Sequence, residues 1–251
     1  MKILVTRPQP EAQRQAAILR DRGHEVIVSP LLDCQLIAPS FSNVPPPDAL
    51  AGVIATSRNA LRGFAKALGQ RADTSKWTAV PLFCVGENTA ALATDLGFKK
   101  RIAGDGNAVD LAAFINRKIS PDAGHLLRLD REHEQPDPLI DALRSDGFMV
   151  SPLQTYRIKP VSQLSEEAQQ AMERGTVDCV VLMSPATARA FCRATACGGV
   201  NLESEHTVYA CLSSAVADAL PRVPARCKFI ADKPNQAGIL SVVDRAVARQ
   251  S

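Results

Sequence analysis

Short apolar runs alternate with amphipathic segments along most of the chain. Runs such as KILV at 2–5, GVIA at 52–55 and CVVL at 179–182 have the length of buried strands. The segments that follow them place apolar residues three and four positions apart, which is typical of helices packed on a sheet. Regular alternation of strand and helix predicts parallel sheets with helices on both faces.

The same pattern gives the expected position of each element. The predicted strands lie at 2–6, 25–29, 51–56, 81–85, 100–103, 125–129, 148–156, 178–183, 207–212 and 227–231. The predicted helices lie at 9–22, 58–69, 88–96, 107–118, 136–146, 163–174, 186–196, 213–220 and 235–248. With about five strands in each half, the pattern fits flavodoxin-like sheets.

The second half of the chain repeats the first. The segment GVIATSRNALRGF at 52–64 has a counterpart in CVVLMSPATARAF at 179–191, and GHEVIVSPLL at 23–32 has one in GFMVSPLQTY at 147–156. The blocks recur in the same order at a nearly constant separation. A repeat this long indicates two similar domains instead of a solenoid of short units.

Prolines mark where the chain passes from one domain to the other. Pro39 and the triplet at 45–47 follow the first strand–helix–strand block, and Pro160 follows its repeat. Two groupings fit this punctuation. The tandem grouping has domains at 1–123 and 124–251, and the exchanged grouping has one domain at 1–35 plus 161–251 and another at 39–155.

Periodicity leaves both groupings open, but the linker segments favour the exchanged one. LDCQLIAP and LQTYRIKP are extended and alternate apolar with polar residues, so they can cross as a paired hinge at about 36–39 and 156–160. The predicted fold class is α/β, with two flavodoxin-like parallel-sheet domains that exchange βαβ units and are joined by a two-stranded linker. Two facing domains also predict a ligand-binding cleft between them.

Composition narrows the class of protein. The 251 residues are 46% hydrophobic and 22% charged, which is ordinary for a soluble globular protein. No run approaches the roughly 20 apolar residues of a membrane span. The opening MKILVTRPQP leads straight into a strand, so we expect no signal peptide and a cytoplasmic protein that does not bind membranes.

Charge and cysteine content argue against two further classes. The net charge is only +3 and aromatic content is 4%, so a nucleic-acid surface is not expected. The seven cysteines lie mostly inside strand or helix patterns and form no CxxC, which favours buried reduced thiols. His125, His133 and Glu134 lack the spacing of a metal site, so no metal is predicted.

The candidate functional residues lie where strands end and helices begin. In open α/β sheets ligands bind beyond the carboxyl ends of the strands, where helix N-termini favour anions. Thr56, Ser57 and Asn59 follow one strand, and Ser184 and Thr187 follow its repeat. Their hydroxyls either cap the next helix or bind a carboxylate, and the sequence leaves both roles open.

A glycine turn follows another predicted strand. Gly86 precedes Glu87, Asn88 and Thr89, and it allows a ligand to approach the backbone closely. The turn matches neither a Walker loop nor GxGxxG. Its counterparts are Ser213 and Ser214, without a glycine, so the two turns are not equivalent.

Two arginines and one tyrosine complete the candidates. Arg7 and Arg128 follow apolar strands, where a guanidinium holds a carboxylate with paired hydrogen bonds or forms an ordinary salt bridge. Tyr156 lies at the predicted hinge, where a phenol donates a proton into a cleft or packs in an interface. Tyr209 lies in a strand pattern and is expected in the core.

Together these blocks resemble the uroporphyrinogen-III synthase family, enzymes that close the linear tetrapyrrole hydroxymethylbilane. The matching segments, which span nearly the whole chain, are ILVTRP, GHEVIVSPLL, ATSRNAL, VGENTAALATDLGF, GFMVSPLQTYRIKP and VVLMSPATARAF. The segment YACLSSAVADAL and the loop RLDREHEQPDP depart from the family pattern.

The resemblance implies a cytoplasmic, monomeric hydro-lyase of porphyrin biosynthesis that uses neither metal nor cofactor. Its active site would lie between two exchanged α/β domains, and it would contact hydroxymethylbilane synthase transiently. Tyr156 aligns with the family tyrosine implicated in loss of the substrate hydroxyl. The substrate-binding residues are expected to be Arg7, Thr56, Ser57, Asn59, Gly86, Glu87, Asn88, Thr89, Arg128, Ser184, Thr187, Ser213 and Ser214.

Two functions other than catalysis stay open at the level of sequence. One is a two-lobed protein that binds small anions, and the other is a regulatory protein on the same fold, because a fold alone proves no activity. A cyclase of this kind mainly positions a reactive species. This explains the absence of a dense catalytic motif in the sequence, and the enzyme is the main interpretation.

Overall fold

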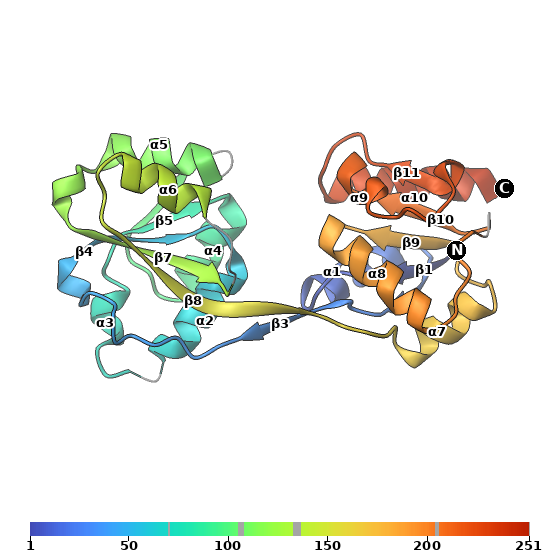
Figure 1. Cartoon of the computed structure of the whole chain (residues 1–251), viewed down its shortest axis with the longest axis horizontal. Coiled ribbons are helices and arrows are strands. Elements are labelled where there is room, and N and C mark those ends of the chain that lie inside the picture. Colours follow the sequence, from blue (N-terminus) through green and yellow to red (C-terminus); the bar gives the residue numbers. More distant parts are fainter. Residues whose placement is uncertain (70, 105–107, 133–136, 204–205, 251) are drawn as a thin grey trace. The chain divides into compact units, whose positions relative to one another are not determined.

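The computed structural model describes residues 1–69, 71–104, 108–132, 137–203 and 206–250. The chain divides into two compact units (Figure 1). The terminal unit combines Met1–Asp33 with Lys159–Ser251, and the central unit is Cys34–Ile158. The predicted domain limits, 1–35 plus 161–251 and 39–155, remain our proposal for the two domains.

The sheet of the terminal unit joins both ends of the chain. Its strand order is β11-β10-β9-β1-β2, and β1 pairs in parallel with β9 so that Leu4 lies opposite Val180. Two N-terminal strands thus complete a sheet begun by three C-terminal ones. This pairing confirms the exchanged βαβ units, and the tandem grouping is wrong. The strands are β1 Lys2–Val5, β2 Glu25–Val28, β9 Cys179–Leu182, β10 Val208–Cys211 and β11 Lys228–Ile230.

The sheet of the central unit has the order β3-β8-β7-β4-β5-β6. Aligned by the sequence repeat, β8 and β7 take the places of β2 and β1, and β4, β5 and β6 take those of β9, β10 and β11. Both parallel sheets therefore have the flavodoxin-like order. The strands are β3 Leu32–Leu36, β4 Leu50–Ala55, β5 Leu82–Val85, β6 Arg101–Gly104, β7 His125–Arg131 and β8 Val150–Pro160.

Strands β3 and β8 form the predicted two-stranded linker. Ile37 N–H donates to the Thr155 carbonyl at 3.0 Å, and Val161 N–H donates to the Leu31 carbonyl at 2.9 Å. Residue numbers rise along one strand as they fall along the other, so the two strands are antiparallel. Strand β8 reaches Pro160, beyond the predicted end at 156, because pairing with β3 continues the ladder past the parallel sheet.

Each predicted helix has a counterpart in the described part of the chain. The short α3 was not predicted, because four residues carry too little periodicity for a helical pattern. The predicted helix starts at 107 and 136, and the loop residues 105–107, lie outside the described residues. The helices are α1 Glu11–Asp21, α2 Arg58–Leu68, α3 Thr74–Trp77, α4 Glu87–Asp95, α5 Ala108–Lys118, α6 Pro138–Ser145, α7 Glu166–Glu173, α8 Pro185–Cys197, α9 Ser214–Asp218 and α10 Gln236–Gln250.

Successive side chains of β4 point to opposite faces of the sheet, so the central unit has a core on each face. Val53 and Ala55 pack with apolar residues of α2, α3 and α4, whereas Ile54 packs with those of α5 and α6. Figure 1 shows α5 and α6 together on one side of this sheet. Trp77 of α3 lies edge-on to Phe64 of α2 at 5.7 Å between ring centroids, which anchors the unpredicted helix.

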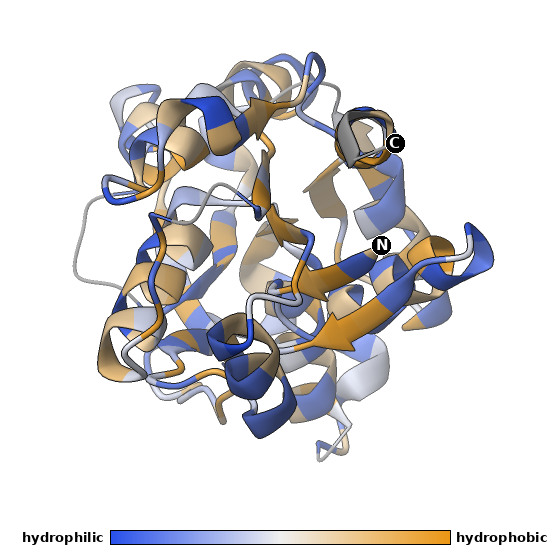
Figure 2. Ribbon diagram, turned by 90° about the vertical axis from the view of Figure 1, so that its right-hand side faces the viewer, coloured by the Kyte–Doolittle hydropathy of each residue, from blue (hydrophilic) through white to orange (hydrophobic). Residues whose placement is uncertain are grey.

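The terminal unit has the same layered construction. Val5 of β1 packs with Ala12 of α1 and Ile239 of α10 on one face. On the other, Tyr209 of β10 lies edge-on to Phe191 of α8 at 6.0 Å between centroids and is 1% exposed, which confirms its predicted place in the core. Figure 2 shows apolar strands between helices that carry both polar and apolar residues. Among the described residues, no helix has the length and apolarity needed to cross a membrane.

Candidate functional site

The predicted site residues of the central unit gather at the β7–β4 pair. In a flavodoxin-like sheet these two strands flank the point where the strand order reverses, and ligands bind beyond the carboxyl ends of the strands at that point. Ile54 of β4 lies opposite Arg128 of β7 in the register of the pair. Thr56 and Ser57 directly follow β4, so their hydroxyls lie at the expected edge of the sheet.

Arg128 is buried among partners of the protein itself. Its side chain donates to Asp137 Oδ2 at 3.0 Å, to Thr56 Oγ1 at 2.9 Å and to the Leu129 carbonyl. Asp130 Oδ1 lies 3.8 Å from the same guanidinium, and Arg128 is 5% exposed. The side chain therefore joins the ends of β4 and β7 to the start of α6. Its contact with a ligand stays a prediction.

The Tyr156 phenol lies beside the N-terminus of α2. Ser57 caps this helix by accepting a hydrogen bond from Asn59 N–H at 3.2 Å. Burial raises the pKa of the Tyr156 phenol, and a side-chain hydrogen bond with Ser57 offsets part of the rise. The negative charge of Asp130 raises that pKa further. The phenol is therefore protonated at neutral pH and is suited to donate a proton.

The glycine turn follows the next strand, β5. Gly86 has φ +76° and precedes α4, and a Cβ built on it would meet no atom within 4 Å. Glu87 and Asn88 are exposed, whereas Thr89 is 6% exposed. Thr89 N–H donates to the Gly86 carbonyl at 3.1 Å, and no described side chain caps α4, so the N–H groups of Glu87 and Asn88 are suited to an anion or water.

The terminal unit repeats this arrangement at its β1–β9 pair. Ser184 caps α8 by accepting from Thr187 N–H at 3.1 Å, and the two hydroxyls lie 2.9 Å apart. Arg7 follows β1 and donates to Gln236 Oε1 of α10 at 3.3 Å. Ser213 and Ser214 follow β10, the neighbour of β9. Each unit thus brings its own predicted residues to one edge of its own sheet.

Comparison with known proteins places these two sheets in a family. The family model described as uroporphyrinogen-III synthase HemD matches residues 13–241. The chain belongs to the uroporphyrinogen-III synthase family. The family comprises enzymes of tetrapyrrole biosynthesis that act on a small molecule. No curated protein sequence matches the chain.

Two solved structures have the same fold as this family member. Uroporphyrinogen-III synthetase from Helicobacter pylori matches with a TM-score of 0.65 at 16% identity, over 97% of this chain and 98% of that chain. A mutant uroporphyrinogen III synthase from Thermus thermophilus matches with a TM-score of 0.57 at 18% identity, over 99% of each chain. At these identities the likeness concerns the fold.

The sequence analysis missed the acidic partners of Arg128. Asp137 caps α6 through Leu139 N–H at 2.9 Å while its other oxygen pairs with Arg128. The sequence Asp137-Pro138 is a recognisable helix start. Its pairing with an arginine on the preceding strand carries no local signal, because the two residues lie nine positions apart and in different elements.

His125 of this family member has an ordinary side-chain partner. His125 Nε2 lies 2.9 Å from Ser151 Oγ, and burial lowers the pKa of its imidazole. His133 and Glu134 lie outside the described residues. Among those described, no three His, Cys, Asp or Glu side chains gather as metal ligands would.

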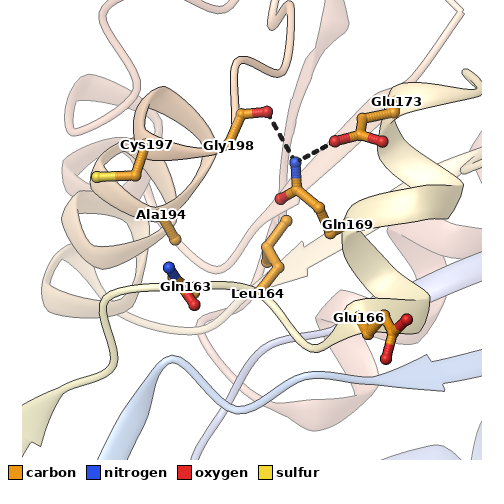
Figure 3. Close-up of a pocket in the computed structure, with 8 residues that line it drawn as sticks. All are labelled: Gln163, Leu164, Glu166, Gln169, Glu173, Ala194, Cys197 and Gly198. Atoms are coloured by element: carbon orange, nitrogen blue, oxygen red, sulfur yellow. Dashed lines mark hydrogen bonds between the residues drawn. The ribbon is translucent and has the colours of Figure 1, made fainter.

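A pocket of about 460 Å³ in the terminal unit lies apart from the predicted residues. It opens between α7 and α8, where Gln169 donates to both the Gly198 carbonyl and Glu173 (Figure 3). The exposed thiol of Cys197 lies on its wall. None of the predicted site residues lines this pocket.

We expect Cys197 to be the fastest-reacting thiol of the native protein. Cys84, Cys179, Cys211 and Cys227 are buried, and burial raises the pKa of Cys179 and Cys211 to about 12, which suppresses the reactive thiolate. Timed reaction with Ellman's reagent should show a fast phase that Cys197→Ser removes and Cys179→Ser leaves. A fast phase that survives Cys197→Ser would contradict this assignment.

Proposed function

We propose that this protein is a uroporphyrinogen-III synthase. It cyclises hydroxymethylbilane to uroporphyrinogen III with loss of water and inversion of ring D through a spiro intermediate, as a cyclising hydro-lyase. The observation that carries the proposal is the family match over residues 13–241. We further propose that it acts as a cytoplasmic monomer and meets hydroxymethylbilane synthase transiently.

The proposed chemistry begins at Tyr156. Its neutral phenol donates a proton to the leaving hydroxyl of ring A, the C–O bond breaks, and water departs as the pyrrole nitrogen lone pair forms an azafulvene. The substituted carbon of ring D attacks this electrophile to give the spiro intermediate, which fragments and recloses with ring D inverted. Loss of a proton from the closed ring restores the phenol. The side-chain hydrogen bond of the phenol with Ser57 supports the donor role because it holds the O–H at the start of α2, and the phenol is in its acid form at neutral pH.

Binding is assigned to the strand-end residues of both units. A substrate with several carboxylates is suited by helix N-termini and hydroxyls, which bind anions without a large net charge. The open N–H groups of α4 beyond Gly86 and the hydroxyls near α2 and α8 support this assignment. The proposed binding residues are Arg7, Thr56, Ser57, Asn59, Gly86, Glu87, Asn88, Thr89, Arg128, Ser184, Thr187, Ser213 and Ser214, with Tyr156 as the acid.

A coupled assay tests the proposal. Porphobilinogen and hydroxymethylbilane synthase generate the linear substrate with and without this protein, and chromatography after oxidation separates type I from type III porphyrins. We expect type III in the presence of the protein, because uncatalysed closure yields the symmetric type I isomer. Type I alone from folded protein would contradict the enzyme and favour an anion-binding or regulatory protein on the same fold.

A further inference from the structure

Helix α2 lies very close to strand β8 beside the Tyr156 phenol. A Cβ built on Gly63 of α2 would lie 2.2 Å from the carbonyl oxygen of Thr155 and 2.9 Å from its carbonyl carbon. Both are backbone atoms that cannot swing aside. Any side chain at position 63 would therefore push the helix away from the strand.

Thr155 is the extra residue of a β-bulge. In the β7–β8 pair, Asp130 lies opposite Gln154 and Arg131 lies opposite Tyr156, so Thr155 has no partner in the register. A bulge breaks the alternation of side chains and changes where the next one points. Both Thr155 and Tyr156 are accordingly buried, at 0% and 7% exposed, although they are consecutive strand residues.

The bulge is held in place by bonds to three neighbouring segments. Thr155 Oγ1 donates to the Ala60 carbonyl of α2 at 2.9 Å and lies 3.4 Å from the Asp130 carbonyl of β7. The Thr155 carbonyl accepts from Ile37 N–H, just after β3, at 3.0 Å. On the helix side, Gly63 of α2 lies against the same Thr155 carbonyl, because it carries no Cβ. One residue thus fixes α2 and its cap Ser57 relative to the strand that carries Tyr156.

We infer that Gly63 and Thr155 are positioning residues, which hold the bulge of β8 against α2 and so aim the Tyr156 phenol at Ser57. The inference rests on the proposed function, because the position of the phenol controls the rate when Tyr156 is the acid of the cyclisation. Neither residue touches the substrate in this account. A displacement of about 1 Å in an aligned catalytic group lowers a rate by about 100-fold.

Activity measurements on matched variants form the first half of the test. Gly63→Ala and Thr155→Val, which removes the hydroxyl and keeps the shape, should each lower the rate of type III formation, by about 100-fold for Gly63→Ala. Thr155→Ser retains the hydroxyl and should restore most of the rate. Gly69→Ala is the control, because Gly69 ends the same helix with φ −59° and its Cβ would lie 3.6 Å from the nearest atom.

Fluorine NMR of protein labelled with 3-fluorotyrosine forms the second half, and it needs no activity. The chain has two tyrosines, so Tyr209→Phe assigns the two signals, and fluorination of the ring lowers the pH at which the phenol ionises. Because the Ser57 bond lowers the pKa of the Tyr156 phenol, Ser57→Ala should raise it. Gly63→Ala and Thr155→Val should shift the Tyr156 signal and its titration in the same direction, and Gly69→Ala should not.

The two halves separate the possible failures. Folded Gly63→Ala or Thr155→Val with wild-type isomer ratio and wild-type titration overturns the inference, and so does lost activity with an unchanged Tyr156 signal. If Gly63→Ala does not fold, Thr155→Val and its Ser counterpart decide. If the wild type yields only type I isomer, the proposed function fails, while the fluorine titration still confirms or overturns the positioning of Tyr156 by this contact.

Discussion

Replacing Tyr156 with Phe is expected to lower the rate of type III porphyrinogen formation by about 100-fold or more. The change removes only the phenol oxygen, so the ring keeps its packing with the core of the central unit. What is lost is the proton offered to the leaving hydroxyl. The measurement is the initial rate of type III product in the coupled assay, where remaining substrate closes to type I.

Tyr209→Phe is the matched control for this substitution. It removes the other phenol of the chain from a core position in the terminal unit, next to Phe191. We expect a type III rate within about threefold of wild type, because Phe keeps the ring packed against Phe191 and none of the predicted site residues is changed. Full type III activity in Tyr156→Phe would remove Tyr156 as the acid and leave positioning as the main contribution of the protein.

The pH dependence of the wild type gives a second check on Tyr156. Its pKa is raised from the ordinary value, so the protonated donor is present throughout neutral and mildly alkaline pH. Loss of rate through this group is expected only as pH rises past the raised pKa. A decline that sets in near neutral pH and disappears in Tyr156→Phe would show that the phenol ionises far more easily than its burial implies.

Replacing Arg128 with Leu is expected to lower the free energy of unfolding by about 3–5 kcal/mol. The guanidinium and its main partner Asp137 are 6% and 11% exposed, with Nε and Oδ2 3.0 Å apart. Removing the cation leaves a nearly buried carboxylate that keeps its bond from Leu139 N–H but loses its counter-ion, and Thr56 loses its donor. Urea unfolding followed by fluorescence of the single tryptophan, Trp77, reports on the central unit that contains this network.

An exposed ion pair in the same unit provides the control for Arg128. Arg157 Nη1 and Glu132 Oε2 lie 3.8 Å apart with side chains 40% and 50% exposed, so Glu132→Gln should cost less than about 1 kcal/mol. The double variant Arg128→Leu/Asp137→Asn should recover part of the loss, because Asn removes the stranded charge and still caps α6. Equal small losses for Arg128→Leu and Glu132→Gln would show that the buried network contributes little.

Features that act over a few residues were predictable from the sequence. Alternating apolar runs located the strands, and Ser57 and Ser184 follow strands as possible caps that the structure confirms as side-chain caps. Caps and periodicity depend on neighbours within one or two turns, so a single sequence contains them. The internal repeat extended this local information to two sheets of the same strand order.

Long-range features needed the tertiary structure. Strand β1 pairs with β9 inside one sheet, and Arg128 binds Thr56 at the strand ends of the other, and both contacts join chain segments distant in sequence. The sequence predicted a hydroxyl and a guanidinium at such strand ends, and only the structure shows that they bind each other.

The Tyr156 environment illustrates the same division. Its place on a predicted strand at the predicted hinge and its resemblance to a family tyrosine follow from the sequence. The bulge at Thr155 and the contact with Gly63 do not, because a one-residue shift in register leaves no trace in hydrophobic periodicity. The sequence by itself determined two α/β repeats, their helix caps and the residues at their strand ends. Which strands exchange, which charges are already paired and where the phenol points were decided by tertiary packing, since each depends on contacts between segments far apart in the chain.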